Sequence, residues 1–497
     1  MAAPREASRG PAGSPAAPAA PAAPSALAQL QALRHLTALL TQQRHRDTAS
    51  ESVFQEVLQR LTEARREAEV ASADWARREH PEPCLQLAAE SFRCLRNACV
   101  RCPANQGVIR NLNLIGVAVD FICLLLRSRA EGESPSSAVR CGLQFLGNIA
   151  TGNSDAQDDI WKRGFPEMFA RCLSHPDAKV AAYSSMVLFT CLDPARTEDL
   201  LQEKHLAVAV PVIEACRNHP EAGWPTLIVT ERLVRRPESV GAVYAKLSDR
   251  ARVTLPDVLL EKLEGGDAAS DPDTTATLRS LAGPLADAFR RTCRSVPTLA
   301  SAPNADRQEA PAAADLLDAL CRMSSDNHLL GSVQACPGLL EAAVAVLRLA
   351  HLAGKQTGNV STPSPLLTGD ADSPSPAAGF KSRLLRLIGN LCYGNRDNQD
   401  QVRRLDGIPL ILDHCRVDDH DPLLSQWAIF AIRNLTERNG RNQEFIARME
   451  RRGLADPALL RSAGLSVEER DGRLTLRSTA RDGDPRTVNG NPRTQLE

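Results

Sequence analysis

The residues best suited to chemistry in this chain are a pair of cysteines. Cys99 and Cys102 form the sequence CVRC, and Cys94 lies close by. Thiolates at this spacing are typical zinc ligands, but a structural zinc site normally needs four ligands from two such pairs. Since the chain contains no second CxxC, we interpret these cysteines as thiols of a core or a loop edge.

The acidic stretch DDHD, residues 418–421, also resembles a metal site. We interpret it instead as the N-cap of a helix that begins near Pro422. The ten histidines form no HExxH pattern, and no GxGxxG, P-loop or GxSxG motif occurs. The sequence therefore predicts a protein that is not an enzyme and that has no cofactor and no metal.

The composition excludes two classes of partner. Lys and Arg number 59 against 60 Asp and Glu, so we expect no nucleic-acid binding, which needs a basic excess. No stretch is apolar for about 18 residues, so we expect no membrane span. The fourteen cysteines are scattered through apolar helical runs, which indicates buried reduced thiols in a cytoplasmic protein.

The hydrophobic pattern divides the chain into helical parts and low-complexity parts. Hydrophobic residues make up 43% and aromatics only 4%, which favours helices packed through aliphatic side chains. The interrupting segments are rich in Ala, Pro, Ser and Gly. We expect a disordered leader at 1–24, helical repeats at 25–356, a disordered Ser/Pro-rich loop at 357–379, further repeats at 380–462, a small hairpin around Asp471-Gly472 at 463–480, and a disordered tail at 481–497.

A motif recurs inside the helical parts. Each of four helices carries an asparagine followed by glutamine nine residues later and by Ile or Val twelve residues later. The four asparagines are Asn97, Asn148, Asn390 and Asn434. A degenerate copy places Arg322 at the asparagine position, and the pattern between 200 and 315 is blurred. A helical period in the 40s predicts an all-α solenoid of armadillo or HEAT type, a right-handed superhelix of helical repeats.

The helical wheel suggests a role for the asparagine. Leu384, Leu387 and Leu391 share one stripe, and Asn390 lies on another side of the helix. We therefore expect Asn390 to face away from the core. Its amide could hold an extended peptide, because it both donates and accepts hydrogen bonds. Alternatively, it caps its own helix or braces the following loop.

The same helix face offers a candidate partner-binding ridge. Arginine and aromatic side chains on an exposed helix face are the types that anchor interfaces, although Trp427 and Phe430 could instead pack against the next repeat. The ridge comprises Arg383, Arg386, Asn390, Trp427, Phe430 and Asn434, with Arg93, Asn97, Gln144 and Asn148 in the earlier copies. An ordered Trp/Asn ladder, as in nuclear-import receptors, is absent, because Arg93, Gln144, Arg386 and Phe430 occupy the tryptophan positions.

Several segments, among them FRCLRNAC, RCGLQFLGNIA, RLIGNLCYGNRDNQD and AIRNLTE, resemble the ataxin-10 family of armadillo-like proteins over about residues 25–480. The resemblance implies a non-enzymatic scaffold with roles in cytokinesis, neurite outgrowth through Ras–MAP-kinase signalling, and neuronal survival. It implies self-association and binding to a heterotrimeric G-protein β subunit, O-GlcNAc transferase and mitotic kinases. It implies a cytoplasmic, perinuclear location with centrosome, basal body and midbody association. The alternative is a regulatory subunit that stimulates an enzyme such as O-GlcNAc transferase.

The Ser/Pro-rich loop contains four sites of the proline-directed kinase type. They are Thr362, Ser364, Ser373 and Ser375, each followed by proline. Phosphate added there would dock on nearby arginines or repel acidic partners. The alternative is a neutral linker.

Overall fold

The computed structural model describes most of the helical part of the chain. The described residues are 26–72, 82–128, 132–265, 271–301, 309–356, 379–415, 423–449, 465–470 and 473–478. The expected leader, Ser/Pro-rich loop and tail lie almost entirely outside these residues. The chain divides into two compact units, residues 1–164 and 165–497, and each is described by itself.

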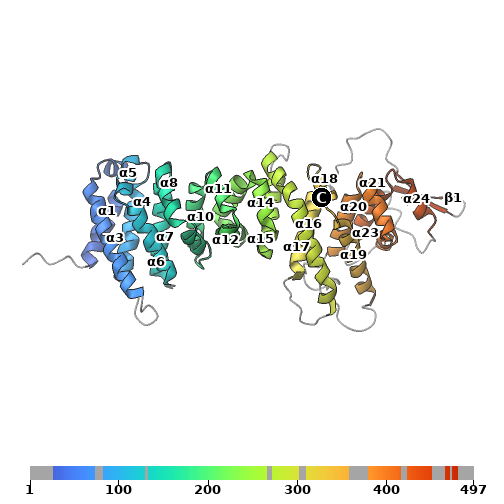
Figure 1. The fold of residues 1–497 in the computed structure, drawn as a ribbon, viewed down its shortest axis with the longest axis horizontal. Helices are drawn as coiled ribbons and strands as arrows, with labels where there is room; N and C mark the ends of the chain where they lie inside the picture. The colour runs from blue at the N-terminus through green and yellow to red at the C-terminus, as the bar shows by residue number, and fades with distance from the viewer. Residues whose placement is uncertain are drawn as a thin grey trace, which may run out of the picture. The chain divides into compact units, whose positions relative to one another are not determined.

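Unit 1 is helical throughout its described residues. Its elements are α1 Ala26–Leu39, α2 Gln43–Asp47, α3 Glu51–Ser72, α4 Glu82–Ala98, α5 Pro103–Asn111, α6 Leu114–Arg127, α7 Glu133–Ala150 and α8 Ser154–Gly164. The long helices α4 and α7 pack side by side, as do α1 and α4 (Figure 1). Between α4 and α7 the chain passes through a short helix, α5, and a longer one, α6, which is the order of a three-helix repeat.

Unit 2 begins with helices that cover the region where the sequence pattern is blurred. They are α9 Glu167–Leu173, α10 Ala178–Cys191, α11 Pro194–Leu200, η1 Glu203–His205, α12 Leu206–Asn218, η2 Pro220–Ala222, α13 Trp224–Leu227, η3 Ile228–Arg232, η4 Leu233–Arg235, α14 Pro237–Tyr244, α15 Asp249–Glu264 and α16 Pro272–Ser301.

The rest of unit 2 repeats the three-helix order more regularly. Its elements are α17 Glu309–Ser325, α18 Leu330–Gln334, α19 Leu339–Gln356, α20 Phe380–Cys392, α21 Arg396–Arg404, α22 Gly407–Leu412, α23 Leu424–Thr436, α24 Gly440–Ala447, β1 Leu465–Arg470 and β2 Arg473–Ser478. The two strands pair antiparallel, with Leu465 opposite Ser478 and Arg470 opposite Arg473.

The apolar stripe of α20 shows why these segments form helices. Leu384, Leu387, Ile388 and Leu391 recur at three- and four-residue steps, and all are at most 1% exposed. Burying such a stripe against neighbouring repeats is what stabilises helices of this length. The prediction of an all-α armadillo-like fold is confirmed.

A glycine permits a close approach between α20 and α23, each of which is the third helix of its three-helix repeat. A Cβ atom on Gly389 of α20 would lie 2.8 Å from the Phe430 ring and 3.2 Å from the Ala431 Cα atom. Both of those residues belong to α23. The Phe430 ring therefore occupies the space that any larger side chain at Gly389 would need.

The cysteines that suggested a zinc site are buried thiols. Cys94, Cys99 and Cys102 are at most 5% exposed, and burial raises the pKa of Cys94 to about 12. Within the described ranges, no group of three or more His, Cys, Asp or Glu residues could hold a metal ion. The DDHD stretch lies outside the described residues.

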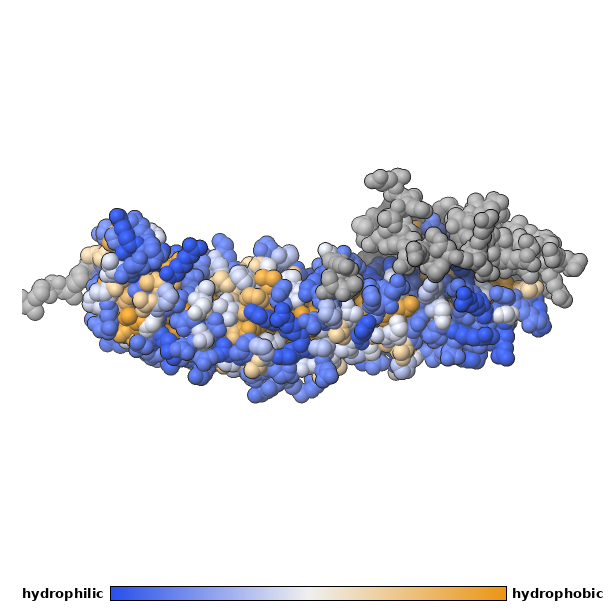
Figure 2. Space-filling model, turned by 90° about the horizontal axis from the view of Figure 1, so that it is seen from above, coloured by the Kyte–Doolittle hydropathy of each residue, from blue (hydrophilic) through white to orange (hydrophobic). Residues whose placement is uncertain are grey.

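No single described helix is long and apolar enough to span a membrane. Together, α5 and α6 have sufficient length and apolar composition, but there is a 68° bend between them. Figure 2 shows that hydrophilic residues dominate the face it presents, with small hydrophobic areas between them.

A buried histidine of unit 2, His414, lies beside the half-buried His351. His414 is 5% exposed, its Nδ1 donates to the Leu410 carbonyl at 2.8 Å, and its Nε2 atom has no hydrogen-bond partner among the described residues. The His351 ring meets it edge-on at 4.8 Å between centroids. Burial, with smaller contributions from His351 and Lys381, lowers the pKa of His414 to about 4.

We predict that the stability of unit 2 falls as His414 becomes protonated in the unfolded chain. A base whose folded pKa lies below its unfolded value of 6.5 stabilises the fold fully above pH 6.5, and that contribution is lost as the pH falls towards 4. By pH 5 the loss should be about 2 kcal/mol. Urea unfolding of the wild type and of His414→Phe at pH 7 and pH 5 measures it. An equal loss in both proteins would contradict the assignment.

Candidate protein-binding surface

The recurring glutamines bond to the ends of the third helices. The last carbonyls of a helix have no partner within it and need outside donors. In unit 1, Gln106 Nε2 donates to the carbonyl of Cys99, just after the preceding third helix α4, and to the carbonyls of Asn148 and Thr151, at the end of the following third helix α7, at 3.2–3.3 Å. Gln106 thus joins the ends of two successive third helices.

Unit 2 contains the same arrangement. Gln399 Nε2 donates to the carbonyls of Cys392 and Asn434, at 3.2 and 2.8 Å. Among the described residues, Gln157 and Gln443 make only the bond to the third helix that directly precedes them, to the carbonyls of Ala150 and Thr436. Each of these four glutamines bonds to the carbonyl seven residues before it, at the end of the preceding third helix. The fixed spacing of nine residues from asparagine to glutamine places the amide where it can reach that carbonyl.

The recurring asparagines bond backward, to the preceding repeat. Asn148 Nδ2 donates to the Arg96 carbonyl at 3.0 Å, and Asn97 Nδ2 donates to the Thr37 carbonyl at 3.1 Å. In unit 2, Asn434 Nδ2 donates to the Gly389 carbonyl at 2.9 Å. The side-chain nitrogen of each asparagine is therefore used within the fold.

The prediction that Asn390 faces away from the core is wrong. Asn390 is 7% exposed, and its Nδ2 donates to the hydroxyls of Ser324 and Ser325 at 3.0 and 3.1 Å. The neighbouring third helix covers this side of α20, which a single-helix wheel cannot show. Nor does the asparagine cap its own helix or brace the following loop, because its amide bonds to the preceding repeat.

The placement of Arg322 at the asparagine position also needs correction. Gln334 Nε2 donates to the carbonyls of Asn390 and Tyr393, at 3.2 and 2.8 Å, as Gln106 and Gln399 do to the equivalent atoms. Nine residues before Gln334 stands Ser325, so Ser325 occupies the asparagine position. Arg322 lies one turn earlier and forms ion pairs instead.

A second repeated feature of the copies, an asparagine next to the glutamine, was missed in the sequence analysis. An asparagine directly precedes the glutamine in three copies: Asn105, Asn398 and Asn442. Each donates its amide to the carbonyl seven residues earlier, those of Ala98, Leu391 and Leu435, at 2.7–3.1 Å. The signal was the dipeptide Asn-Gln, which stands at the same distance from each third helix.

In unit 1, the two remaining candidate residues are half-buried and bonded between helices. Arg93 forms an ion pair with Glu90 at 3.0 Å and donates to the Ser137 hydroxyl at 3.3 Å. Gln144 Oε1 accepts a hydrogen bond from Arg96 at 2.7 Å. The ion pair lies within α4, whereas the two hydrogen bonds join α4 to α7.

In unit 2, the structure brings three candidate residues into one cluster. The Arg386 guanidinium lies over the Trp427 ring at 5.2 Å and donates to the Ser325 hydroxyl at 2.7 Å. The Trp427 and Phe430 rings meet edge to face at 5.5 Å. We call Arg386, Trp427 and Phe430 the arginine–aromatic cluster; all three are half-buried.

Arg383 lies one turn before this cluster and is also half-buried. Burial raises the pKa of Asp315, whereas the positive charges of Arg217 and Arg383 act to lower it. A partner-binding role for the ridge residues stays a prediction. The candidate phosphorylation sites Thr362, Ser364, Ser373 and Ser375 lie outside the described residues.

Three-helix repeats joined by these amide bonds define an armadillo-like helical-repeat protein. A family model described as the spinocerebellar ataxia type 10 protein domain matches residues 380–477. Over 90% of its length the chain is 49% identical to ataxin-10 of Bos taurus and 48% identical to ataxin-10 of Homo sapiens, covering 94% of each. The chain belongs to the ataxin-10 family.

Similarity to solved structures is weaker. One chain comes from a study of the interaction between cadherin and beta-catenin; it shares 13% identity, with 86% of this chain and 73% of that chain covered and a TM-score of 0.33. Another comes from the SYS-1/POP-1 complex, with 11% identity, 82% and 73% coverage, and a TM-score of 0.34. At these scores the similarity carries no functional argument.

We predict that Gln399→Ala destabilises unit 2 by about 2 kcal/mol, because buried carbonyls lose their donor. Gln399 is 3% exposed, so water cannot replace the amide without rearrangement. Urea unfolding measures the change. The control is Gln202→Ala, at an exposed position, which should change stability by less than about 0.5 kcal/mol. Equal effects of the two substitutions would contradict the bridging role.

Proposed function

We propose that this protein is a non-enzymatic scaffold that binds other proteins through the arginine–aromatic cluster of unit 2. The observation that carries the proposal is the stacking of Arg386 on Trp427, on helices that pack closely. Arginine and tryptophan are the side chains most often found at the energetic centre of interfaces. The contact between Arg386 and Trp427 already orders both side chains. Little of their conformational entropy would therefore be lost when a partner binds.

Membership of the ataxin-10 family supports the cellular part of the proposal. By this likeness, the scaffold acts in cytokinesis, in neurite outgrowth through Ras–MAP-kinase signalling and in neuronal survival. Its partners would be a heterotrimeric G-protein β subunit, O-GlcNAc transferase, mitotic kinases and a second copy of itself. It would act in the perinuclear cytoplasm and at the centrosome, basal body and midbody.

The choice of variant follows from the packing of the cluster. Phe430 fills the space beside Gly389, so its removal would disturb the fold as well as the surface. Trp427 and Arg386 are the better pair, because both side chains are half-buried and neither is the ring that packs against Gly389. The control is Arg171→Glu, a charge reversal at an arginine whose side chain is 45% exposed on α9.

We predict that the Arg386→Glu, Trp427→Ala variant loses specific partners. Affinity purification from dividing cells, with quantification by mass spectrometry, should show a fall of roughly tenfold relative to wild type and to the Arg171→Glu control. Circular dichroism and urea unfolding verify that both variants are folded. Full retention of every partner by the folded double variant would overturn the proposal.

A further inference from the structure

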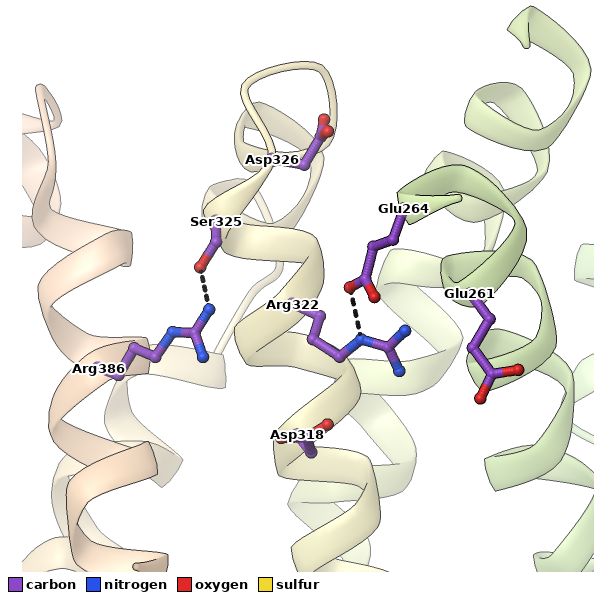
Figure 3. A pocket seen from close by; sticks show the side chains of 7 residues that line it. All are labelled: Glu261, Glu264, Asp318, Arg322, Ser325, Asp326 and Arg386. Carbon is purple, nitrogen blue, oxygen red and sulfur yellow. Dashed lines mark hydrogen bonds and ion pairs between the residues drawn. The ribbon is translucent and has the colours of Figure 1, made fainter. Parts of the chain in front are cut away.

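A polar groove lies beside the arginine–aromatic cluster. It encloses about 480 Å³ between α15, α17 and α20. Its lining residues are Glu261 and Glu264 from α15, Asp318, Arg322, Ser325 and Asp326 from α17 and the turn after it, and Arg386 from α20 (Figure 3). Arg386 belongs to both features, so the groove and the Trp427 ring form one continuous surface.

One arginine of the groove serves several carboxylates. Arg322 forms ion pairs with Glu264 at 2.9 Å and with Asp257 at 3.3 Å, both on α15. It also interacts electrostatically with Asp318, one turn earlier on its own helix. The Arg322 guanidinium therefore faces more negative charge than it can neutralise.

The second arginine of the groove does not pair with a described carboxylate. Arg386 donates to the Ser325 hydroxyl and stacks on Trp427, and it forms no ion pair with any described residue. Asp326 accepts hydrogen bonds from the backbone N–H groups of His328 and Leu329, at 2.7 and 3.1 Å. Its carboxylate is thus occupied in holding the turn after α17.

Two carboxylates of the groove form no ion pair with a described residue. Within the described part of the chain, Glu261 and Asp318 take part in no ion pair. Each lies one turn before a member of the Arg322–Glu264 pair, on the same two packed helices (Figure 3). Glu261 and Asp318 are therefore available to a further cation, because the nearby Arg322 pairs with Glu264 and Asp257 and interacts with Asp318 only at longer range.

Asp257, also on α15, is buried among charges of both signs, with Arg322 and Arg217 acting to lower its pKa and Asp315 and Asp318 acting to raise it. Burial raises the pKa of Asp257 to about 6, although the charge of Arg322 acts to lower it. A further cation close to α15 would bring this carboxyl back towards its ordinary range.

We propose that the groove binds an arginine or lysine side chain carried on an extended segment of a partner protein, between Glu261 and Asp318. The charge of the groove is complementary to a cation, and a guanidinium can bond two carboxylates at once. The adjoining Trp427 ring offers apolar contact to the neighbouring residue of the segment. This inference rests on the proposed scaffold function and names the chemistry of the bound segment.

The probe is a fluorescein-labelled (Gly-Arg)4 peptide, measured by fluorescence anisotropy on the full chain at 150 mM salt. We expect Glu261→Gln with Asp318→Asn to raise its Kd by about fivefold or more. The matched control is Glu231→Gln with Asp273→Asn, which changes the net charge equally at two exposed carboxylates of unit 2 that form no ion pair among the described residues. The control should bind as the wild type does.

A third variant changes binding in the opposite direction. Arg322→Gln removes the resident guanidinium, so peptide binding should tighten by about threefold if the variant remains folded by circular dichroism. Equal weakening in the Glu261/Asp318 variant and its control would show general charge attraction and overturn the inference. So would tighter binding of (Gly-Asp)4, absence of binding by the wild type, or equally tight, equally variant-sensitive binding of free spermine.

The failure of this inference is distinct from the failure of the proposed scaffold function. If the Glu261/Asp318 variant binds the peptide normally while Arg386→Glu, Trp427→Ala still releases cellular partners, only the groove assignment falls. If the peptide result holds and no partner is lost in cells, the groove chemistry stands and the scaffold proposal falls.

Discussion

The structure depends on how the carbonyl groups at the ends of its third helices are satisfied. A helix that ends inside a stack of repeats leaves carbonyls away from bulk water, and each one without a donor is costly. The side-chain amides of Gln106 and Gln399 supply those donors. Because each amide also reaches the next repeat, the same bonds fix the spacing between neighbouring third helices.

The backward bonds of the asparagines complete this arrangement. Asn434 donates to the carbonyl of Gly389, the residue of α20 that lies against Phe430 and Ala431 of α23. The absence of a side chain at Gly389 permits that approach, and the Phe430 ring fills the space. Asn390 also donates its amide to the preceding third helix, but to the serine hydroxyls of Ser324 and Ser325 rather than to a carbonyl. The amide donor is thus common to these positions, whereas the acceptor differs.

This bracing determines which residues are left for recognition. With the asparagines directed into the stack, the polar face of the third helices is formed by arginines, aromatics and carboxylates. In unit 2 these gather as the stacked pair of Arg386 and Trp427 and as the charged groove around Arg322. A rigid backbone beneath them means that their positions are set before any partner arrives.

Local patterns were enough to predict the class of fold. The spacing of Leu384, Leu387 and Leu391 required a helix with one buried stripe, and the fixed offset from each asparagine to its glutamine revealed the repeat. The core cysteines followed from their place in apolar runs. These inferences succeed because helical periodicity and short-range offsets are properties of the chain itself.

The sequence by itself determined the helical repeats, the stripe that each buries and the Asn–Gln spacing. Only the tertiary structure decided that Asn390 is buried, that Ser325 rather than Arg322 stands at the asparagine position, and that Glu261 and Asp318 line one groove. The physical reason is that a helical wheel describes one helix, whereas each third helix is covered on a second side by its neighbours. Contacts across 56 to 66 residues set the environment of these polar groups, and no local pattern encodes them.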